Sequence, residues 1–140
     1  MARAWMKAAL AGMAIMAMTA PVHAADTIKI GVPGAHSGDL VSYGMPSLNA
    51  ARIVADEYNA KGGILGVPVK PVYVDEGAGT NQLLSEYRRV VQEQGAQVML
   101  GAISSGSCNA LAPVAEDLKV VNVMWDCGTQ TIFEDGKWKY

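Results

Sequence analysis

One segment, residues 28–66, restricts the possible fold more than any other part of the sequence. It begins with the β-branched run IKIGV, continues through the polar loop GAHSGDLVSYG, and enters the amphipathic run SLNAARIVADEYNAK before the glycines of GGILG. A buried strand, a loop and a helix that is closed by glycine are the opening of a βαβ unit. The sequence therefore predicts an α/β fold.

The remaining elements alternate in the same way. Helical periodicity predicts helices over residues 46–61, 80–95 and 107–118, with Thr80 capping the second, Gly95 ending it, and Pro113 implying a kink or a late start in the third. Apolar runs predict strands over 27–32, 67–74, 97–103 and 120–125. Pro68 and Pro71 lack N–H donors, so the second strand is expected at a sheet edge.

Strands that alternate with helices predict a parallel sheet with right-handed crossovers. The loops that follow the strands then open at one edge of the sheet, where such folds bind their ligands. Four loops are expected there: residues 33–45, 75–80, 104–108 and 126–131.

The first 24 residues have the three parts of a secretory signal peptide. Arg3 and Lys7 precede an apolar run over 8–20, and small residues lead to a cleavage site after Ala24. No cysteine lies at this site, so the prediction is an exported, soluble product without a lipid anchor. Residues 25–140 form its folded part, with nine basic and thirteen acidic residues. Because nucleic-acid binding depends on basic residues that neutralise phosphates, this composition makes nucleic acid a poor partner.

Three serines, Ser104, Ser105 and Ser107, lie where the third helix is expected to begin. Their hydroxyls and the free backbone N–H groups of a helix N-terminus suit a carboxylate ligand. The same serines are also typical helix caps, and the two roles can coexist.

The sequence resembles the periplasmic substrate-binding proteins of branched-chain amino acid ABC importers, the leucine/isoleucine/valine-binding type. The resemblance extends from Ile28 to about Val123, through the motifs IKIGVPGAHSG, Tyr43-Gly44, NAKGGILG at 59–66, Asp75, LGAISSGS and APVAED at 112–117. It implies a type I fold of two Rossmann-like lobes that close over a small ligand for delivery to a membrane permease, and a periplasmic location. The chain would be the N-terminal portion of the first lobe, so 25–140 is expected to be an incomplete lobe that lacks the hinge and the second lobe.

The resemblance also implies ligand contacts. It points to Tyr43 and Ser105, and to polar groups of the segment 126–129, among them Asp126 and Thr129. Ser104 is a further candidate from its place at the beginning of the third helix. Where relatives that bind aliphatic amino acids carry small residues and a Thr, this chain reads Trp125-Asp126-Cys127-Gly128-Thr129. Trp125 could stack on an aromatic ligand or lie in the core, and Asp126 could pair with an amine or form a turn.

The two cysteines, Cys108 and Cys127, lie 19 residues apart. In an oxidising compartment such a pair favours a disulfide, although two separate buried thiols remain the alternative. Only His36 remains outside the signal peptide and no CxxC spacing occurs, so neither a metal site nor a cofactor is expected. His36 and Ser37 do not form a GxSxG nucleophile elbow, and His36 is interpreted as a polar residue at the rim of the ligand edge.

The predicted function is that of the extracytoplasmic solute-binding component of an ABC importer, which captures an amino acid or a similar small carboxylate or aromatic compound without catalysis. The alternative is a ligand-sensing ectodomain of a receptor or regulator with the same fold. A secreted enzyme is disfavoured because no paired carboxylates are found at the loop edge. An incomplete sheet is also expected to leave an apolar face uncovered, which would promote association or bind an apolar dye.

Overall fold

A computed structural model describes residues 27–134 and 137–140, so the predicted signal peptide lies outside the described residues. It contains one parallel sheet of four strands, β1 (Ile28–Gly34), β2 (Val69–Asp75), β3 (Val98–Leu100) and β4 (Val121–Val123). The strand order is β2-β1-β3-β4. The predicted α/β fold with a parallel sheet is confirmed.

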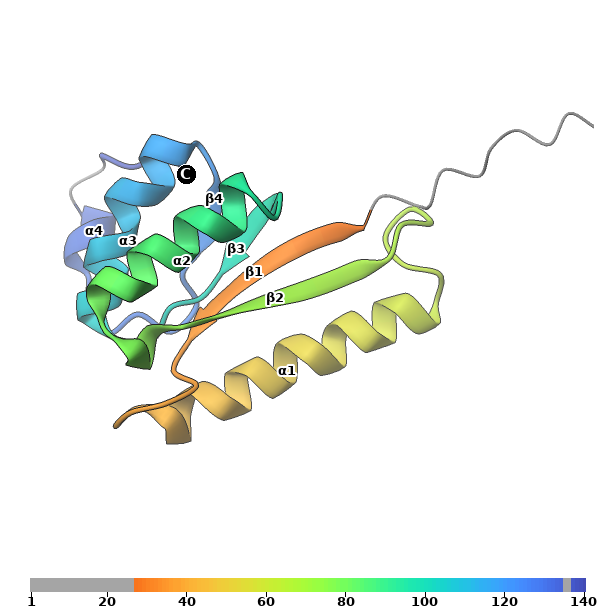
Figure 1. The fold of residues 1–140 in the computed structure, drawn as a ribbon, viewed down its shortest axis with the longest axis horizontal. Coiled ribbons are helices and arrows are strands. Elements are labelled where there is room, and N and C mark those ends of the chain that lie inside the picture. The colour runs from red at the N-terminus through yellow and green to blue at the C-terminus, as the bar shows by residue number, and fades with distance from the viewer. Residues whose placement is uncertain (1–26, 135–136) are drawn as a thin grey trace, which may run out of the picture.

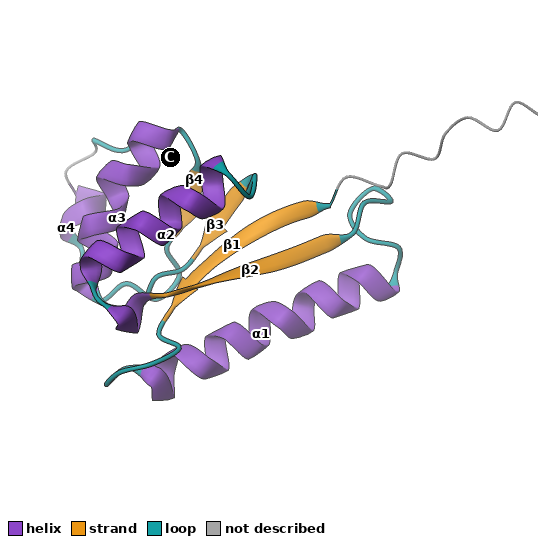
Figure 2. Ribbon diagram, viewed as in Figure 1, coloured by secondary structure: helices purple, strands orange, loops and turns teal. Residues whose placement is uncertain are grey.

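Helices cover the two faces of the sheet unequally (Figure 1). The long helix α1 (Val41–Ala60) lies on one face, and α2 (Thr80–Gln92) and α3 (Ser105–Leu118) lie on the other. Two short elements complete the chain: the 3₁₀ helix η1 (Glu76–Ala78) between β2 and α2, and α4 (Thr131–Glu134) beside α3 (Figure 2).

The prediction that the second strand lies at an edge is confirmed. Pro71 of β2 pairs with Ile30 of β1, and no described strand lies on the other side of β2. The side chain of Asn59, near the end of α1, occupies that open side. Its amide donates to the carbonyl of Val69 at 2.8 Å, and its carbonyl oxygen accepts from the Val69 N–H at 2.7 Å. Backbone groups that an edge strand would leave open are thus satisfied by the preceding helix.

The closed face of the sheet, which α2 and α3 cover, holds the main hydrophobic core. Several of its side chains have no solvent exposure, namely Leu83, Tyr87, Val90, Met99 and Leu111. The apolar stripe predicted for the second helix supplies three of them. Met99 leaves no room above Gly31, where a Cβ atom would collide with its sulfur.

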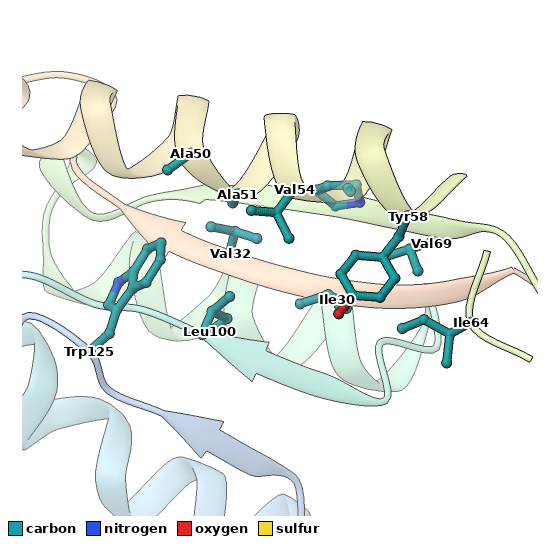
Figure 3. Close-up of a pocket in the computed structure, with 12 residues that line it drawn as sticks. Ile30, Val32, Ala50, Ala51, Val54, Tyr58, Ile64, Val69, Leu100 and Trp125 are labelled. Carbon is teal, nitrogen blue, oxygen red and sulfur yellow. The ribbon is translucent and has the colours of Figure 1, made fainter. Parts of the chain in front are cut away.

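The open face, which carries α1, is only partly covered. An apolar groove of 370 Å³ runs between α1 and the sheet, and Leu100 and Trp125 line its far side (Figure 3). Val54 and Tyr58 of α1 face this groove and are each 51% exposed. Beyond it, Val121 and Val123 of β4 are 49% and 50% exposed. One helix therefore covers β1 and β2 but leaves β3 and β4 open on this face.

Several predicted boundaries were wrong. Helix α1 begins at Val41 rather than residue 46 and includes Pro46, because the turn before this proline packs Gly44 against the Ala35 carbonyl. Thr80 does not cap α2, since the cap residue is Gly79 with φ of 101°.

Helix α3 begins at Ser105 and continues unbroken through Pro113 to Leu118. Strands β3 and β4 are shorter than predicted, three residues each. Gly95 adopts the left-handed conformation expected of a residue that ends a helix, with φ of 72°.

Candidate functional site

A hollow of 280 Å³ lies at the carboxyl edge of the sheet, among the loops that follow β1, β2 and β3. Its lining residues come from these three loops: Ala35, Ser37, Gly38, Asp39, Leu40, Glu76, Gly77 and Ser104. The strand that follows β1 in the chain, β2, lies on one side of β1, and the next strand, β3, lies on the other side of β1. Such a switch point is where open α/β sheets bind ligands, because neighbouring loops diverge there.

The β3–α3 loop contributes a helix N-terminus to this edge. The Ser104 hydroxyl accepts from the Ser107 N–H at 3.1 Å and donates to the Ser107 hydroxyl at 2.8 Å, so Ser104 caps α3. The next two N–H groups, of Ser105 and Gly106, have no hydrogen-bond acceptor within the described part of the chain. They add to the positive end of the dipole of a 14-residue helix, which can accept a carboxylate.

The β1–α1 loop is held at the hollow by Asp75. One carboxylate oxygen accepts from the N–H groups of His36 and Gly77, each at 2.9 Å, and the other accepts from the Ser37 hydroxyl at 2.7 Å. Burial alone would raise the pKa of Asp75, but these hydrogen bonds outweigh it and lower the pKa below its ordinary value. The side chain is therefore a carboxylate at neutral pH.

The structure brings only some of the predicted ligand residues together. Ser104 lines the hollow, and Ser105 lies beside the β4–α4 loop, since a Cβ atom on Gly128 would be 3.2 Å from its hydroxyl. Asp126 is exposed in that loop.

Two other predicted residues lie away from the hollow. Thr129 accepts from the Thr131 N–H at 3.3 Å, just before α4. Tyr43, in the first turn of α1, is 64% exposed and is not among the residues that line the hollow.

A disulfide joins Cys108 and Cys127, with 6.2 Å between their Cα atoms. Cys108 is fully buried in α3, and Cys127 packs against the same core from the β4–α4 loop. The bond thus fixes the loop that contains Asp126 and Thr129 to the beginning of α3.

The side chains of His36 and Trp125 do not line this hollow, although His36 stands between two residues that do. The imidazole of His36 packs edge-on against Tyr73, with ring centroids 5.7 Å apart, and lines a separate hollow beside α1. Trp125 lines the apolar groove of the open face and is 41% exposed, so it lies neither in the closed core nor at the loop hollow.

Glu76 is the site residue that the sequence interpretation missed. It is 8% exposed, lines the hollow, and accepts hydrogen bonds from the N–H groups of Ile103 and Ser104. The available signal was its position, because it directly follows a strand at the ligand edge and stands next to Asp75. The expectation that this edge carries no paired carboxylates was therefore wrong.

Within residues 27–134 and 137–140, no group of three or more His, Cys, Asp or Glu side chains is placed to hold a metal ion. Among the same residues, no helix has both the length and the apolar character that a bilayer crossing requires.

A parallel sheet with diverging loops and an open helix N-terminus at its switch point is typical of α/β proteins that bind a small ligand at this edge. The comparisons with known proteins agree with this class. A family model described as "Periplasmic binding protein" matches residues 27–137, and the chain belongs to that family.

Two relatives show where the chain lies in this family. It is 31% identical over 111 residues to the leucine-specific-binding protein of Salmonella typhimurium, and 32% identical over 111 residues to the Leu/Ile/Val-binding protein of Escherichia coli. Each match covers 79% of this chain and 30% of the relative. The chain thus spans under a third of the length of these curated relatives.

Solved structures agree on the fold. The branched-chain amino acid transporter substrate-binding protein LivJ from Streptococcus pneumoniae, in complex with isoleucine, matches with a TM-score of 0.74 and 26% identity. The match covers 81% of this chain and 32% of that chain. A solute-binding protein of an ABC transporter from Rhodopseudomonas palustris, with 3,4-dihydroxybenzoic acid bound, matches with a TM-score of 0.71 at 20% identity, which supports the fold alone.

Proposed function

We propose that this chain is the N-terminal part of the solute-binding component of an ABC importer, and that it captures an amino acid or a similar small carboxylate or aromatic compound. The observation that carries the proposal is the beginning of α3, where the N–H groups of Ser105 and Gly106 remain open at the sheet edge. A ligand carboxylate placed there would accept both hydrogen bonds and benefit from the helix dipole.

The relatives support this ligand class. Proteins named for leucine and for leucine, isoleucine and valine match most of this chain, and the LivJ structure holds isoleucine. In the proposal, Ser104 and Ser105 contact the ligand from α3, while Tyr43, Asp126 and Thr129 reach it from the neighbouring loops. The exposure of Tyr43 and Asp126 leaves both side chains accessible to a ligand.

The proposed partner is the permease of the same importer, and the proposed location is the periplasm. Both follow from the relatives, which are periplasmic binding proteins and transporter components by name. The substrate-binding class also implies that the chain makes and breaks no bonds in its ligand.

A titration followed by backbone NMR tests the proposal. L-isoleucine at millimolar concentration is expected to shift the Ser105 and Gly106 amide signals, whereas (S)-2-methylbutylamine, which keeps the side chain but lacks the carboxylate, is expected to leave them in place. Ser105→Ala should weaken the L-isoleucine response by several-fold. Ser85→Ala, at an exposed serine of α2, serves as the matched control and should have no effect.

Equal responses to the acid and the amine would contradict carboxylate recognition at α3. Shifts that appear only along the apolar groove of the open face would place the binding site elsewhere on the molecule. A panel of branched-chain amino acids and 3,4-dihydroxybenzoate then separates aliphatic from aromatic ligands.

A further inference from the structure

Two adjacent carboxylates at the end of β2 bind two different loops of the hollow. Asp75 is the last residue of β2 and Glu76 is the first residue of η1. Asp75 accepts hydrogen bonds from the β1–α1 loop, and Glu76 accepts them from the β3–α3 loop. Neither set of bonds is needed to form the sheet itself, because all their loop donors lie beyond the strand ends.

The Asp75 contacts join the β1–α1 loop to η1. Its Oδ1 atom accepts from His36 N at 2.9 Å, from Ser37 N at 3.3 Å and from Gly77 N at 2.9 Å. Its Oδ2 atom accepts from the Ser37 hydroxyl at 2.7 Å. A carboxylate with four donors fixes the path of the loop more firmly than one neutral hydrogen bond would.

The Glu76 contacts extend further across the sheet. Strands β2 and β3 are not neighbours, because β1 lies between them. Nevertheless, Glu76 Oε2 accepts from Ile103 N at 3.2 Å and Oε1 accepts from Ser104 N at 3.3 Å. Its side chain thus passes the end of β1 to reach the loop that starts α3.

Burial indicates that these bonds matter for Glu76. It is 8% exposed, and a carboxylate so far from water is costly unless hydrogen bonds compensate it. The two backbone N–H groups provide that compensation. One of them belongs to Ser104, the cap residue that precedes the open N–H groups of α3.

Gly77 shows how closely the loops approach. A Cβ atom at this position would collide with the backbone carbonyl of Ser37. Only glycine therefore lets η1 lie against the β1–α1 loop at the distance that the Asp75 hydrogen bonds require.

We propose that Asp75 and Glu76 are positioning residues of the ligand site, which hold the β1–α1 loop and the beginning of α3 at a fixed separation across the end of β1. They act through the loops that they hold, and Glu76 also lines the hollow. The inference rests on the proposed function for its importance to binding, but the fixing of the loops is measurable without any ligand.

Amide hydrogen exchange of the unliganded protein, resolved by residue with NMR, tests the loop fixing. Glu76→Gln is expected to increase exchange at Ile103 and Ser104 by about tenfold or more, because its amide group presents a donor to one of the two N–H groups. Asp75→Asn is expected to increase exchange at His36, Ser37 and Gly77 by a similar factor. Each variant is the control for the other, and Glu57→Gln on the exposed surface of α1 controls for the change in charge.

Gly77→Ala disturbs the contact between η1 and the β1–α1 loop without altering either carboxylate. This variant keeps the inference testable if Asp75→Asn fails to fold. It should reproduce the faster exchange at His36 and Ser37 and leave Ile103 protected. Uniformly faster exchange, including at Val90 and Met99 of the core, would indicate simple destabilisation and overturn the proposal. Unchanged exchange in both loops would overturn it as well.

An L-isoleucine titration of the same variants connects the loops to binding. Affinity is expected to fall several-fold in Glu76→Gln and Asp75→Asn and to stay unchanged in Glu57→Gln. Unchanged affinity in the two variants, despite faster exchange in their loops, would overturn the positioning role. If the unsubstituted chain binds neither L-isoleucine nor any other ligand of the panel, the proposed function fails, and the exchange data still decide whether the carboxylates fix the loops.

Discussion

The two faces of the sheet differ in how completely they are packed, although one chain of alternating strands and helices builds both. On the closed face, Val90 of α2 has no exposure, whereas on the open face Val54 of α1 lines the groove beside the sheet and is 51% exposed. The difference is one of coverage, because two helices lie over the closed face and one lies over the open face (Figure 1). Helical periodicity identifies the apolar stripe of a helix, but only the number of neighbouring elements determines how much of it is buried.

The largest expected effect concerns the covalent link of the closed face. Removal of the Cys108–Cys127 disulfide, by Cys108→Ala with Cys127→Ala, should lower the free energy of unfolding by about 2–4 kcal/mol, since the unfolded chain regains the freedom of the closed loop. Urea denaturation with and without reductant measures this. Reductant should destabilise the unsubstituted protein and leave the double variant unchanged, and an unfolding midpoint insensitive to reductant would contradict the prediction.

A matched pair of valines tests the packing difference directly. Val90→Ala should cost about 2 kcal/mol through lost burial and a residual cavity, whereas Val54→Ala should change stability by less than about 0.5 kcal/mol. Both substitutions replace a helical valine by alanine, so their helix propensities cancel in the comparison. Equal losses in urea denaturation would mean that the open face is covered in solution.

Removal of one buried hydroxyl should have a smaller effect on stability, of opposite sign. Tyr87 has no exposure, and its hydroxyl lacks a hydrogen-bond partner among the described residues. Tyr87→Phe should therefore preserve stability or raise it by about 1 kcal/mol.

The pH dependence of the free energy of unfolding tests whether burial of the Tyr87 phenol causes this effect. Burial raises the pKa of Tyr87 above its usual value of about 10, so the folded state keeps the phenol neutral where the unfolded state ionises. This contribution to stability is fully present below pH 10 and is lost as the pH rises further. Urea denaturation near pH 11 should show a smaller alkaline loss in Tyr87→Phe than in the unsubstituted protein, and parallel losses would contradict this account.

The smallest expected change in the free energy of unfolding comes from a substitution on the open face. Val123→Thr keeps the shape of a half-exposed side chain and should change the free energy of unfolding by less than about 0.5 kcal/mol. It should nevertheless reduce the fluorescence of a dye that binds exposed apolar surface. Val120→Thr is the contrasting variant, because this side chain is 5% exposed and a buried hydroxyl should cost about 1–3 kcal/mol. A large loss of stability in Val123→Thr would indicate that its face is packed after all.

Local sequence patterns predicted the order of the elements, the edge position of β2 and the role of Gly95, because each of these depends on periodicity or on one residue's backbone preference. They misplaced the beginning of α1, because Pro46 suggested a first helical position while the contact of Gly44 with Ala35 is set by tertiary packing. Nothing local identifies such a contact.

The candidate site was predictable only in outline. The serines before α3 and the loop edge followed from capping chemistry and parallel topology. The reach of Glu76 to Ile103 joins residues 27 positions apart in sequence, and the direction in which Trp125 projects depends on which face α1 leaves open. Both depend on where elements meet in space rather than on any single segment.

The central place of β1 also has a consequence for how this sheet can be assembled as the chain emerges from its amino end. The strand order β2-β1-β3-β4 lets β2 add beside β1, β3 add to the other side of β1, and β4 add beside β3. Each new strand thus meets an edge that earlier residues have already made, and none must insert between two paired strands. Such a chain can extend the sheet outward in the order in which its strands appear.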